Sequence, residues 1–387
     1  MVRYMIEETD GTSEASMPGR LAWGGARAAS FMCLACGDAT PRYATVSVVN
    51  PVGRPPVLEF FRCGRCGSLQ PELFEQPSYY LDADVKVASR FYVHLRARID
   101  AMIRPVAAAL RLMPDARTFL DVGCGFGFAG RLFGLDAHGI DPSAYAEEGA
   151  RALHVRIFHE LLGQGSPIDG RMFDIVCASE VLEHVEDPSA FLATLARAVA
   201  DDGLLVLTTP AAESVTQDAW PEQVLSSLSP GYHRFLFSVA ALREALVARG
   251  FEHVLVWRDR EHLAAVASRR RDVASFRIES ERPAYRRYLS TLIESDVDVQ
   301  CRIGAAFRLY QDQVNGGEFA SAARTRATMQ ALVADAYGLD VDSLASLSPT
   351  VDAPYDFNTF SDHAPFFLSG LLYCRGMELL NAGGIRG

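Results

Sequence analysis

The stretch Thr118-Phe119-Leu120-Asp121-Val122-Gly123-Cys124-Gly125-Phe126-Gly127 decides the fold of this chain. Its first five residues have the pattern of a buried strand, and the glycines that follow let the backbone turn and approach a ligand closely. A helix is expected directly after the loop, from Phe128 to Phe133. A strand, a glycine-rich turn and a helix in this order predict a cofactor site at the loop.

Strands and helices alternate along the chain from about residue 114 to residue 268. Such alternation with short connections predicts an α/β fold with a doubly wound, mostly parallel sheet of seven strands. After 118–122, strands are expected at 137–140, 155–158, 173–178, 203–209, 254–257 and 263–267, with helices at 188–200 and 238–249. Because the last two strands are adjacent and resemble a hairpin, we expect one antiparallel strand at the edge of the sheet.

The spacing of the glycines distinguishes between two kinds of cofactor. Asp141 lies 20 residues after Asp121, at the end of the next strand, where a carboxylate can reach ribose hydroxyls. A nicotinamide site would share this feature, but the dinucleotide fingerprint needs a third glycine at position 128, which is Phe128. The observed Gly-x-Gly-x-Gly spacing suits a cofactor with an amino-acid end and a nucleoside end.

With these motifs the sequence resembles the class I S-adenosylmethionine-dependent methyltransferases. The resemblance covers about residues 114–268, and four motifs occur in the order that the family has. They are LDVGCGFG at 120–127, GIDPS at 139–143, FDIVCASEVLEHV at 173–185 and GLLVLTTP at 203–210. The resemblance implies that the chain is an enzyme with S-adenosylmethionine as its cofactor.

The same resemblance implies which residues line the cofactor site. Asp141 would bind the ribose, His159 and Glu160 would lie near the adenine, and Ser179 and Glu180 would flank the sulfonium end. The complete implied set is Asp121, Gly123, Cys124, Gly125, Phe126, Gly127, Asp141, Pro142, His159, Glu160, Ser179 and Glu180.

Two Cys-x-x-Cys pairs near the N-terminus predict a metal site. Cys33 and Cys36 form the first pair, Cys63 and Cys66 form the second, and a glycine follows each pair. Thiolates at this spacing can occupy two corners of one tetrahedron, so the segment is interpreted as a structural zinc ribbon. The alternative is disulfides or free thiols; disulfides are disfavoured because no secretory signal precedes the pairs.

The zinc ribbon adds a second resemblance, to bacterial methyltransferases that act on sugars, nucleotide sugars and related glycans. In that group a Tyr-rich segment follows the second cysteine pair, as Tyr79 and Tyr80 do here. A His-bearing stretch after the fifth strand corresponds to 231–238. In the deoxysugar C-methyltransferases of this group a Glu precedes that His, whereas Tyr232 precedes His233 here, so O-methylation stays open beside C-methylation.

Three side chains are candidates for catalysis. His233 is expected to act as the base that removes a proton from the acceptor, because an imidazole titrates near neutral pH. The alternative is a histidine that only hydrogen-bonds the backbone around the substrate. His184 is expected to contact the cofactor or the substrate, and Tyr80 could close over the cofactor or belong to the core.

Composition excludes several functions. With 387 residues, 49% of them hydrophobic, the chain can bury a large core. Its one lysine, Lys86, stands outside any Gly-Lys-Ser/Thr run, which excludes a P-loop. The net charge of -11 and the lack of a basic domain argue against nucleic acid as a partner and against RNA methylation. No apolar run approaches 18 residues, so no membrane-spanning helix is expected.

Four segments are expected, together with one main function and one alternative. The segments are a disordered tail at 1–29, a zinc ribbon with a Tyr-rich connector at 30–82, a methyltransferase domain at 83–268 and a helical domain at 269–387. The main function is methylation of a small polar acceptor such as a sugar, in the cytoplasm. The alternative is an adaptor with a methyltransferase fold, which binds a protein partner or a second copy of itself through 269–387.

Overall fold

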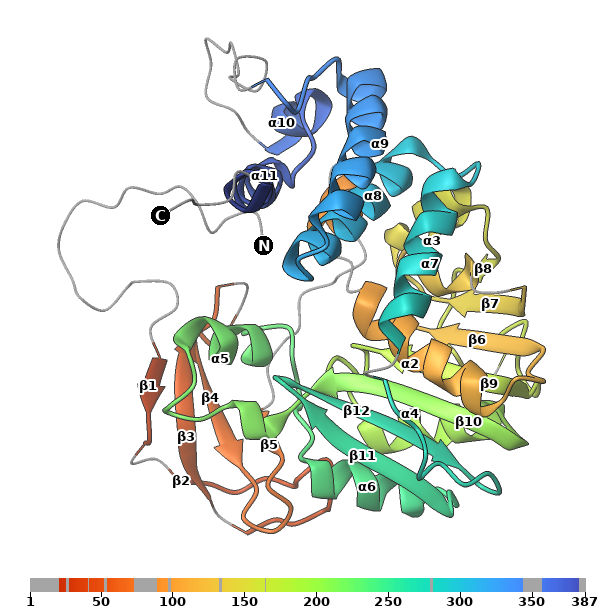
Figure 1. The fold of residues 1–387 in the computed structure, drawn as a ribbon. Helices are drawn as coiled ribbons and strands as arrows, with labels where there is room; N and C mark the ends of the chain where they lie inside the picture. The colour runs from red at the N-terminus through yellow and green to blue at the C-terminus, as the bar shows by residue number, and fades with distance from the viewer. Residues whose placement is uncertain are drawn as a thin grey trace, which may run out of the picture.

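A computed structural model describes the fold between residues 21 and 382. Within that span, the residues left undescribed are 26–27, 41, 52–53, 73–88, 97–98, 132–133, 164, 279–280 and 344–356. The predicted site residue Tyr80 lies outside the described residues. The described residues form two β-sheets, and helices surround the larger one (Figure 1).

The N-terminal sheet is small and antiparallel. Its strands are β1 (Leu21–Trp23), β2 (Ala28–Ala29), β3 (Arg42–Val49), β4 (Val57–Arg62) and β5 (Leu69–Pro71), in the order β1-β3-β4-β5 with β2 paired to β3. The ribbon therefore begins before residue 30, and the tail expected at 1–29 is too long. Leu21 and Trp23 explain the difference, because they pack against the ribbon cluster that contains Val46 and Phe60.

The second sheet has seven strands in the order β11-β12-β10-β9-β6-β7-β8, which confirms the doubly wound prediction. Its strands are β6 (Thr118–Val122), β7 (Asp136–Ile140), β8 (Ile157–Phe158), β9 (Phe173–Ser179), β10 (Val199–Pro210), β11 (His253–Asp259) and β12 (His262–Ser268). β12 runs antiparallel to both of its neighbours in this sheet, β10 and β11, and lies between them. The expected edge position is wrong because β12 is buried almost throughout, which requires a strand on either side.

Helices cover both faces of this sheet, and alternate residues of each strand point to opposite faces. Phe119 and Ile175 belong to one hydrophobic cluster, whereas Leu120 and Val176 belong to the other. The first face packs against α2 (Ile99–Leu112), α3 (Ala144–Leu153) and the later helices, and the second against α4 (Pro188–Ala198) and α6 (Val239–Val247). The strands are consequently apolar on both sides, as in other parallel sheets.

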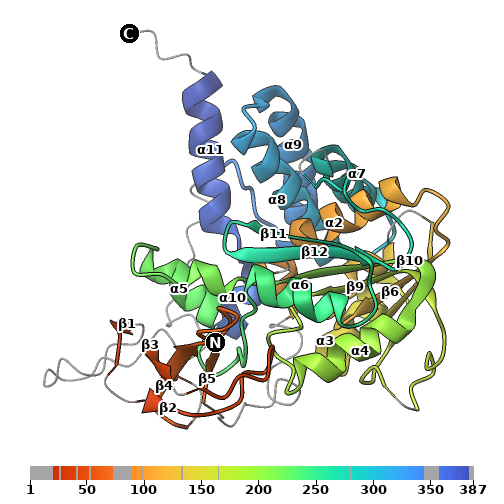
Figure 2. The same ribbon diagram turned by 90° about the horizontal axis from the view of Figure 1, so that it is seen from below.

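The C-terminal helices continue the core on the α2 side of the sheet. They are α7 (Arg282–Glu294), α8 (Val299–Asn315), α9 (Phe319–Tyr337), α10 (Phe357–His363) and α11 (Leu368–Ala382). Figures 1 and 2 place α8, α9 and α11 side by side, next to α7. Side chains of α7, α8, α9 and α11 belong to the same hydrophobic cluster as Phe119 of β6, and the Tyr288 hydroxyl donates to the Phe128 carbonyl at 2.6 Å. The helical block is thus packed onto the sheet domain.

The segment between β10 and α6 packs against the ribbon. It contains the short helix η4 (Ala212–Ser214) and α5 (Pro221–Leu228). Arg62 of β4 donates hydrogen bonds to the Ala212 and Val215 carbonyls at 3.0 and 2.9 Å. Leu69 and Leu236 exchange two backbone hydrogen bonds. Ser238 caps α6 as predicted, since its hydroxyl accepts from the Ala241 amide.

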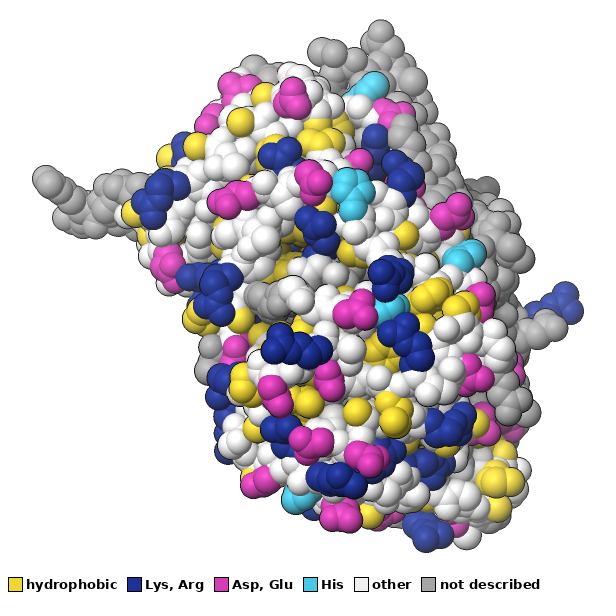
Figure 3. Space-filling model, turned by 90° about the vertical axis from the view of Figure 1, so that its right-hand side faces the viewer, with side chains coloured by type: hydrophobic (Ala, Val, Ile, Leu, Met, Phe, Trp, Pro, Cys, Tyr) yellow, Lys and Arg dark blue, Asp and Glu magenta, His cyan; other side chains and the backbone are white. Residues whose placement is uncertain are grey.

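Two surface properties bear on partners. On the face in Figure 3, acidic side chains and arginines are interspersed, so the basic side chains visible there form no continuous stripe. Among the described residues, no helix is both long enough and apolar enough to cross a bilayer.

Candidate functional site

The glycine loop follows β6 at the point where the strand order reverses, since β7 and β9 pair with β6 on opposite sides. Gly123, Gly125 and Gly127 all have positive φ, at 69°, 51° and 81°. A Cβ on Gly123 would lie 2.4 Å from Cγ2 of Val181, so that position has no room for a side chain. The backbone here is therefore shaped for close approach to a ligand.

Asp141 lies beside the glycine loop and is hydrogen-bonded to it. Its Oδ2 accepts a hydrogen bond from the Gly125 amide, and its Oδ1 accepts one from the Ser143 amide, both at 2.8 Å. These two bonds fix the carboxylate at the end of β7, beside the glycine loop. The position is the one from which an acidic residue reaches a ribose in this class of fold.

Asp121 lies beneath the loop and is almost completely buried. Its Oδ2 has no hydrogen-bond partner among the described residues, so a donor from a bound molecule would satisfy it. Burial, followed by the nearby charge of Asp141, raises the pKa of Asp121 to about 7. A cofactor that brings a cationic or hydrogen-bonding group fits this position.

The remaining predicted cofactor residues surround the same loop. Cys124 and Phe126 are buried within it, and Pro142 follows Asp141 directly. His159 is exposed, and its Nε2 lies 2.8 Å from the Ser143 carbonyl. Glu160 is exposed next to it.

Ser179 and Glu180 stand at the end of the neighbouring strand β9. The Ser179 hydroxyl lies 2.7 Å from that of Thr208, and Glu180 has a positive φ of 58°. A positive φ is uncommon outside glycine, and such strained residues cluster at functional sites.

Two histidines and a glutamate form a compact cluster near the ends of β9 and β10. Ligand atoms of Glu183, His184 and His233 all lie within 4.8 Å of one another, so this set could hold a metal ion. The Nδ1 atoms of His184 and His233 face the carbonyls of Tyr232 and Ser227 at 3.1 and 2.7 Å. Burial, followed by the nearby His184, lowers the pKa of His233 to about 3.

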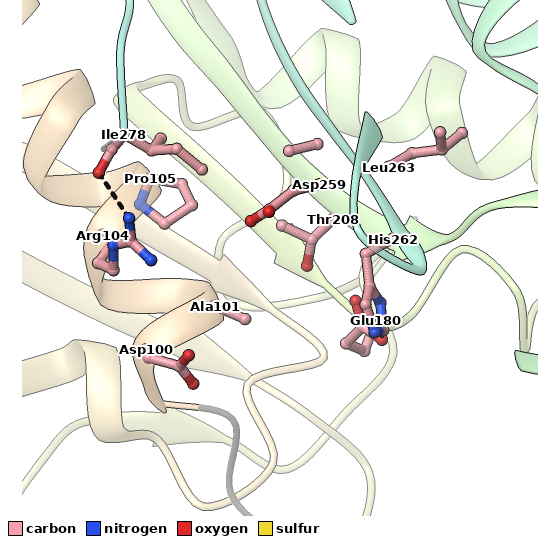
Figure 4. A pocket seen from close by; sticks show the side chains of 11 residues that line it. Asp100, Ala101, Arg104, Pro105, Glu180, Thr208, Asp259, His262, Leu263 and Ile278 are labelled. Carbon is pink, nitrogen blue, oxygen red and sulfur yellow. Dashed lines mark hydrogen bonds and ion pairs between the residues drawn. The ribbon is translucent and has the colours of Figure 1, made fainter. Parts of the chain in front are cut away.

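A pocket opens at the carboxyl ends of β9 and β10 (Figure 4). Glu180 and Thr208 line it from the sheet, and Asp100 and Arg104 line it from α2. The remaining lining residues include Asp259, His262 and Leu263 from the β11–β12 hairpin. Figure 4 places the side chains of Glu180 and His262 against each other, and His262 Nδ1 lies 3.1 Å from Glu180 Oε2. His233 is not among the residues that line this pocket.

Several residues of the site were missed from the sequence. Glu183 had a signal, because Glu180-x-x-Glu183-His184 places three ligand-type side chains in one short segment after a strand. No sequence signal pointed to His262 and Asp259. Their hairpin comes near the end of β9 only in the folded sheet, where β10 pairs with both β9 and β12. Tyr92, which lies over Gly125, belongs to a segment with no motif of its own.

The four cysteines of the ribbon come together as predicted. Their sulfur atoms all lie within 4.8 Å of one another, and Cys33–Cys66 and Cys36–Cys63 are each 3.6 Å apart. The two knuckles have matching backbone hydrogen bonds, from the Gly37 amide to the Cys33 carbonyl and from Gly67 to Cys63. No disulfide joins any of the eight cysteines, so this geometry is compatible with a bound metal ion or with free thiols.

Known proteins resemble the sheet domain. A family model described as a methyltransferase domain matches residues 93–256. A ubiquinone biosynthesis O-methyltransferase from Rhizobium johnstonii is 34% identical over 148 residues, which cover 34% of this chain and 59% of that protein. A protein of the same name from Rhodopseudomonas palustris is 40% identical over 98 residues, which cover 23% of this chain and 38% of the relative. The chain thus spans less than two thirds of the length of these relatives.

Solved structures resemble the same part of the chain. An O-methyltransferase family protein from Burkholderia thailandensis has a TM-score of 0.40 and 17% identity, with 48% of this chain and 59% of that chain covered. A SAM-dependent methyltransferase from Thermotoga maritima has a TM-score of 0.37 and 19% identity, with 48% and 96% covered.

Proposed function

Residues 93–256 carry a methyltransferase domain, and on that premise we propose that the chain transfers the methyl group of S-adenosylmethionine to a small polar acceptor. The observation that supports this most is the glycine loop, where three glycines with positive φ meet the clasped carboxylate of Asp141. An intact loop of this kind favours a working cofactor site over a scaffold.

Asp121, Gly123, Gly125, Gly127 and Asp141 would hold the cofactor. When bound, S-adenosylmethionine supplies a methyl group on a sulfonium that is already a good leaving group. The protein then has to bind the two molecules in line, exclude water and accept the proton of the acceptor. The buried Oδ2 of Asp121 and the carboxylate of Asp141 would orient the cationic and ribose ends of the cofactor.

The acceptor would enter the pocket of Figure 4, beside Glu180 at the end of β9. Three carboxylates, one arginine and one histidine line this pocket. A sugar or another polyhydroxyl molecule can hydrogen-bond such a lining, whereas a hydrocarbon-rich acceptor would leave the charges unsatisfied. This polarity supports the saccharide class, although the named relatives belong to ubiquinone biosynthesis.

Two histidine sites compete for the role of proton acceptor. His233, with His184 beside it, is the candidate from the sequence; if it were the base, His233→Ala would remove most turnover and leave the cofactor affinity unchanged. His262 lines the pocket itself and contacts Glu180. We assign the base to His262, because a base must come within hydrogen-bonding reach of the proton that it removes.

Zinc would bind to the four cysteines of the ribbon. Four Zn–S bonds of about 2.3 Å in a tetrahedron place the sulfurs about 3.8 Å apart, close to the 3.6 Å found for Cys33–Cys66 and Cys36–Cys63. The proposed role is structural, since so small a sheet buries little apolar surface alone. Cysteines that form no disulfide are typical of proteins in a reducing compartment, which supports a cytoplasmic location.

Binding of a protein partner or a second copy through 269–387 remains part of the proposal. Helix α11 exposes large apolar side chains, namely Leu372, Tyr373, Leu379 and Leu380. Sedimentation analysis of the wild type and of Leu379→Glu would test self-association through this helix.

Calorimetry with S-adenosylmethionine separates the enzyme from the adaptor. Micromolar binding supports the enzyme, and no binding supports the adaptor. If binding is seen, a screen of nucleotide sugars for release of S-adenosylhomocysteine then identifies the acceptor. Turnover on apolar phenols alone would contradict the polar-acceptor proposal.

A further inference from the structure

A short segment before α2 contacts both the glycine loop and the C-terminal helices. It is the segment 89–96, which includes the π-helical turn η2 (Tyr92–Arg96). The Tyr92 ring centroid lies 6.3 Å from that of Phe126 in the glycine loop and 5.8 Å from that of Tyr145. The Tyr92 hydroxyl lies 3.3 Å from the position that a Cβ on Gly125 would take. One face of the segment thus lies over the cofactor loop.

The Tyr92 hydroxyl is held as a neutral hydrogen-bond donor. Burial, followed by the negative charges of Asp121 and Asp141, raises the pKa of Tyr92 well above its ordinary value. A donor above two carboxylates is suited to a ligand that has both cationic and acceptor groups. Single π-helical turns are also frequent at functional sites.

The C-terminal block holds the backbone on the opposite face of the segment. Arg308 of α8 donates from Nη2 to the Val93 carbonyl at 2.8 Å. Gly304, one turn earlier on α8, is so close that a Cβ there would lie 2.8 Å from the same carbonyl oxygen. At the start of the segment, Arg90 pairs with Asp362 at 2.8 Å.

Aromatic packing adds to these contacts. His94 is almost fully buried, and its ring lies 5.4 Å from Phe367 and 6.2 Å from Phe366, between α10 and α11. Phe91 meets Phe366 edge to face at 5.3 Å. The residues on both sides of Tyr92 are therefore fixed by the C-terminal helices, which leaves its ring little freedom to move away from the loop.

We propose that Tyr92 contacts the bound cofactor, and that the C-terminal helical block is the positioning device that holds Tyr92 over the glycine loop. This inference rests on the proposed function, because it needs a cofactor at the loop. It gives the helices of 269–387 a task inside the enzyme, independent of any partner. Arg308 and Gly304 are positioning residues in this arrangement, and Tyr92 is the residue that touches the ligand.

The first test measures cofactor affinity by calorimetry. Tyr92→Ala is expected to raise the Kd for S-adenosylmethionine at least tenfold, and Tyr92→Phe about fivefold, as for the loss of one hydrogen bond. The control is Tyr337→Phe, which removes a hydroxyl that donates to Gln300 within the C-terminal block. This control should leave the Kd unchanged.

A double-mutant cycle tests the positioning role. Arg308→Met should weaken cofactor binding in the wild-type background and have no further effect in the Tyr92→Ala background. Arg308→Lys should restore part of the affinity. If Arg308→Met fails to fold, Phe366→Ala replaces it, because it removes the ring contacts with Phe91 and His94, together with one to Phe360 in the C-terminal block.

The outcomes separate the two proposals. A wild type that binds no S-adenosylmethionine overturns the proposed function. A wild type that binds it with the same Kd as Tyr92→Ala overturns the cofactor contact alone. An equal effect of Arg308→Met in both backgrounds means that the helices stabilise the fold generally and do not act through Tyr92.

Discussion

His262 Nδ1 lies 3.1 Å from Glu180 Oε2, which joins the tip of the β11–β12 hairpin to the end of β9. Glu180 holds its place through a hydrogen bond from its amide to the Thr208 carbonyl and adopts a positive φ. The pair forms one wall of the pocket in Figure 4, so the imidazole is oriented by a carboxylate where an acceptor would bind. A histidine base with an orienting carboxylate, the role proposed for His262, requires such a contact.

The first prediction follows from that contact. His262→Gln should lower kcat by about a hundredfold or more, because the proton acceptor is lost. The carboxylates of Glu180 and Glu261 lie 3.1 and 3.4 Å from the nitrogens of this ring. His253→Gln, at the other end of the hairpin, is the matched control. An unchanged kcat in His262→Gln would return the role to His233.

Crowding at the glycine loop gives the second prediction. Gly123→Ala and Gly170→Ala both place a side chain at positive φ, but only the first meets neighbours, since nothing lies within 4 Å of a Cβ on Gly170. Gly123→Ala should therefore lower the free energy of unfolding by about 1–3 kcal/mol more than Gly170→Ala. Adding Val181→Ala should restore part of the difference. Equal effects of the two substitutions in chemical denaturation would contradict this.

The third prediction concerns the ribbon. Metal analysis should find about one zinc per chain, lost in Cys63→Ser and kept in Cys374→Ser. Because Arg62 of the ribbon binds the Ala212 and Val215 carbonyls, chelation should also raise amide hydrogen exchange in 212–228. Exchange in α8 should stay constant as the internal reference. A wild-type protein without zinc would end the ribbon hypothesis.

The fourth prediction is a pH dependence of stability. Asp121 ionises near 3.8 in the unfolded chain, but its folded pKa is raised to about 7 by burial and by Asp141. Between these two pKa values the Asp121 carboxyl is protonated in the folded state and ionised in the unfolded state. The free energy of unfolding therefore decreases as the pH rises from about 4 to about 7.

Asp121→Asn removes this loss. The free energy of unfolding of the variant, relative to the wild type, should grow by about 1.4 kcal/mol per pH unit across that window and then stay level. Asp335→Asn, at an exposed position on α9, is the control for removal of a carboxylate outside the loop. Parallel curves for Asp121→Asn and the wild type would mean that Asp121 is not protonated in the folded protein.

Local sequence patterns predicted the structural features that depend on residues close together in the chain. The strand at 118–122, its glycine loop, Asp141 and the two cysteine pairs each rest on short-range spacing, and the structure brings each set together. The Ser238 cap of α6 was predicted for the same reason. The place of β12 inside the sheet was predicted wrongly, because strand order depends on burial on both sides and not on adjacency in the sequence.

By itself, the sequence determined the doubly wound sheet, the cofactor loop and the cysteine cluster, because each is indicated by a local pattern: alternating strands and helices, glycine spacing or ligand spacing. Only the tertiary structure decided how distant segments meet. It placed His262 against Glu180, Arg62 against the segment after β10, and the C-terminal helices behind Tyr92. These contacts join residues about 80 to 215 positions apart, and they form because burial of apolar surface selects which faces of the packed elements meet.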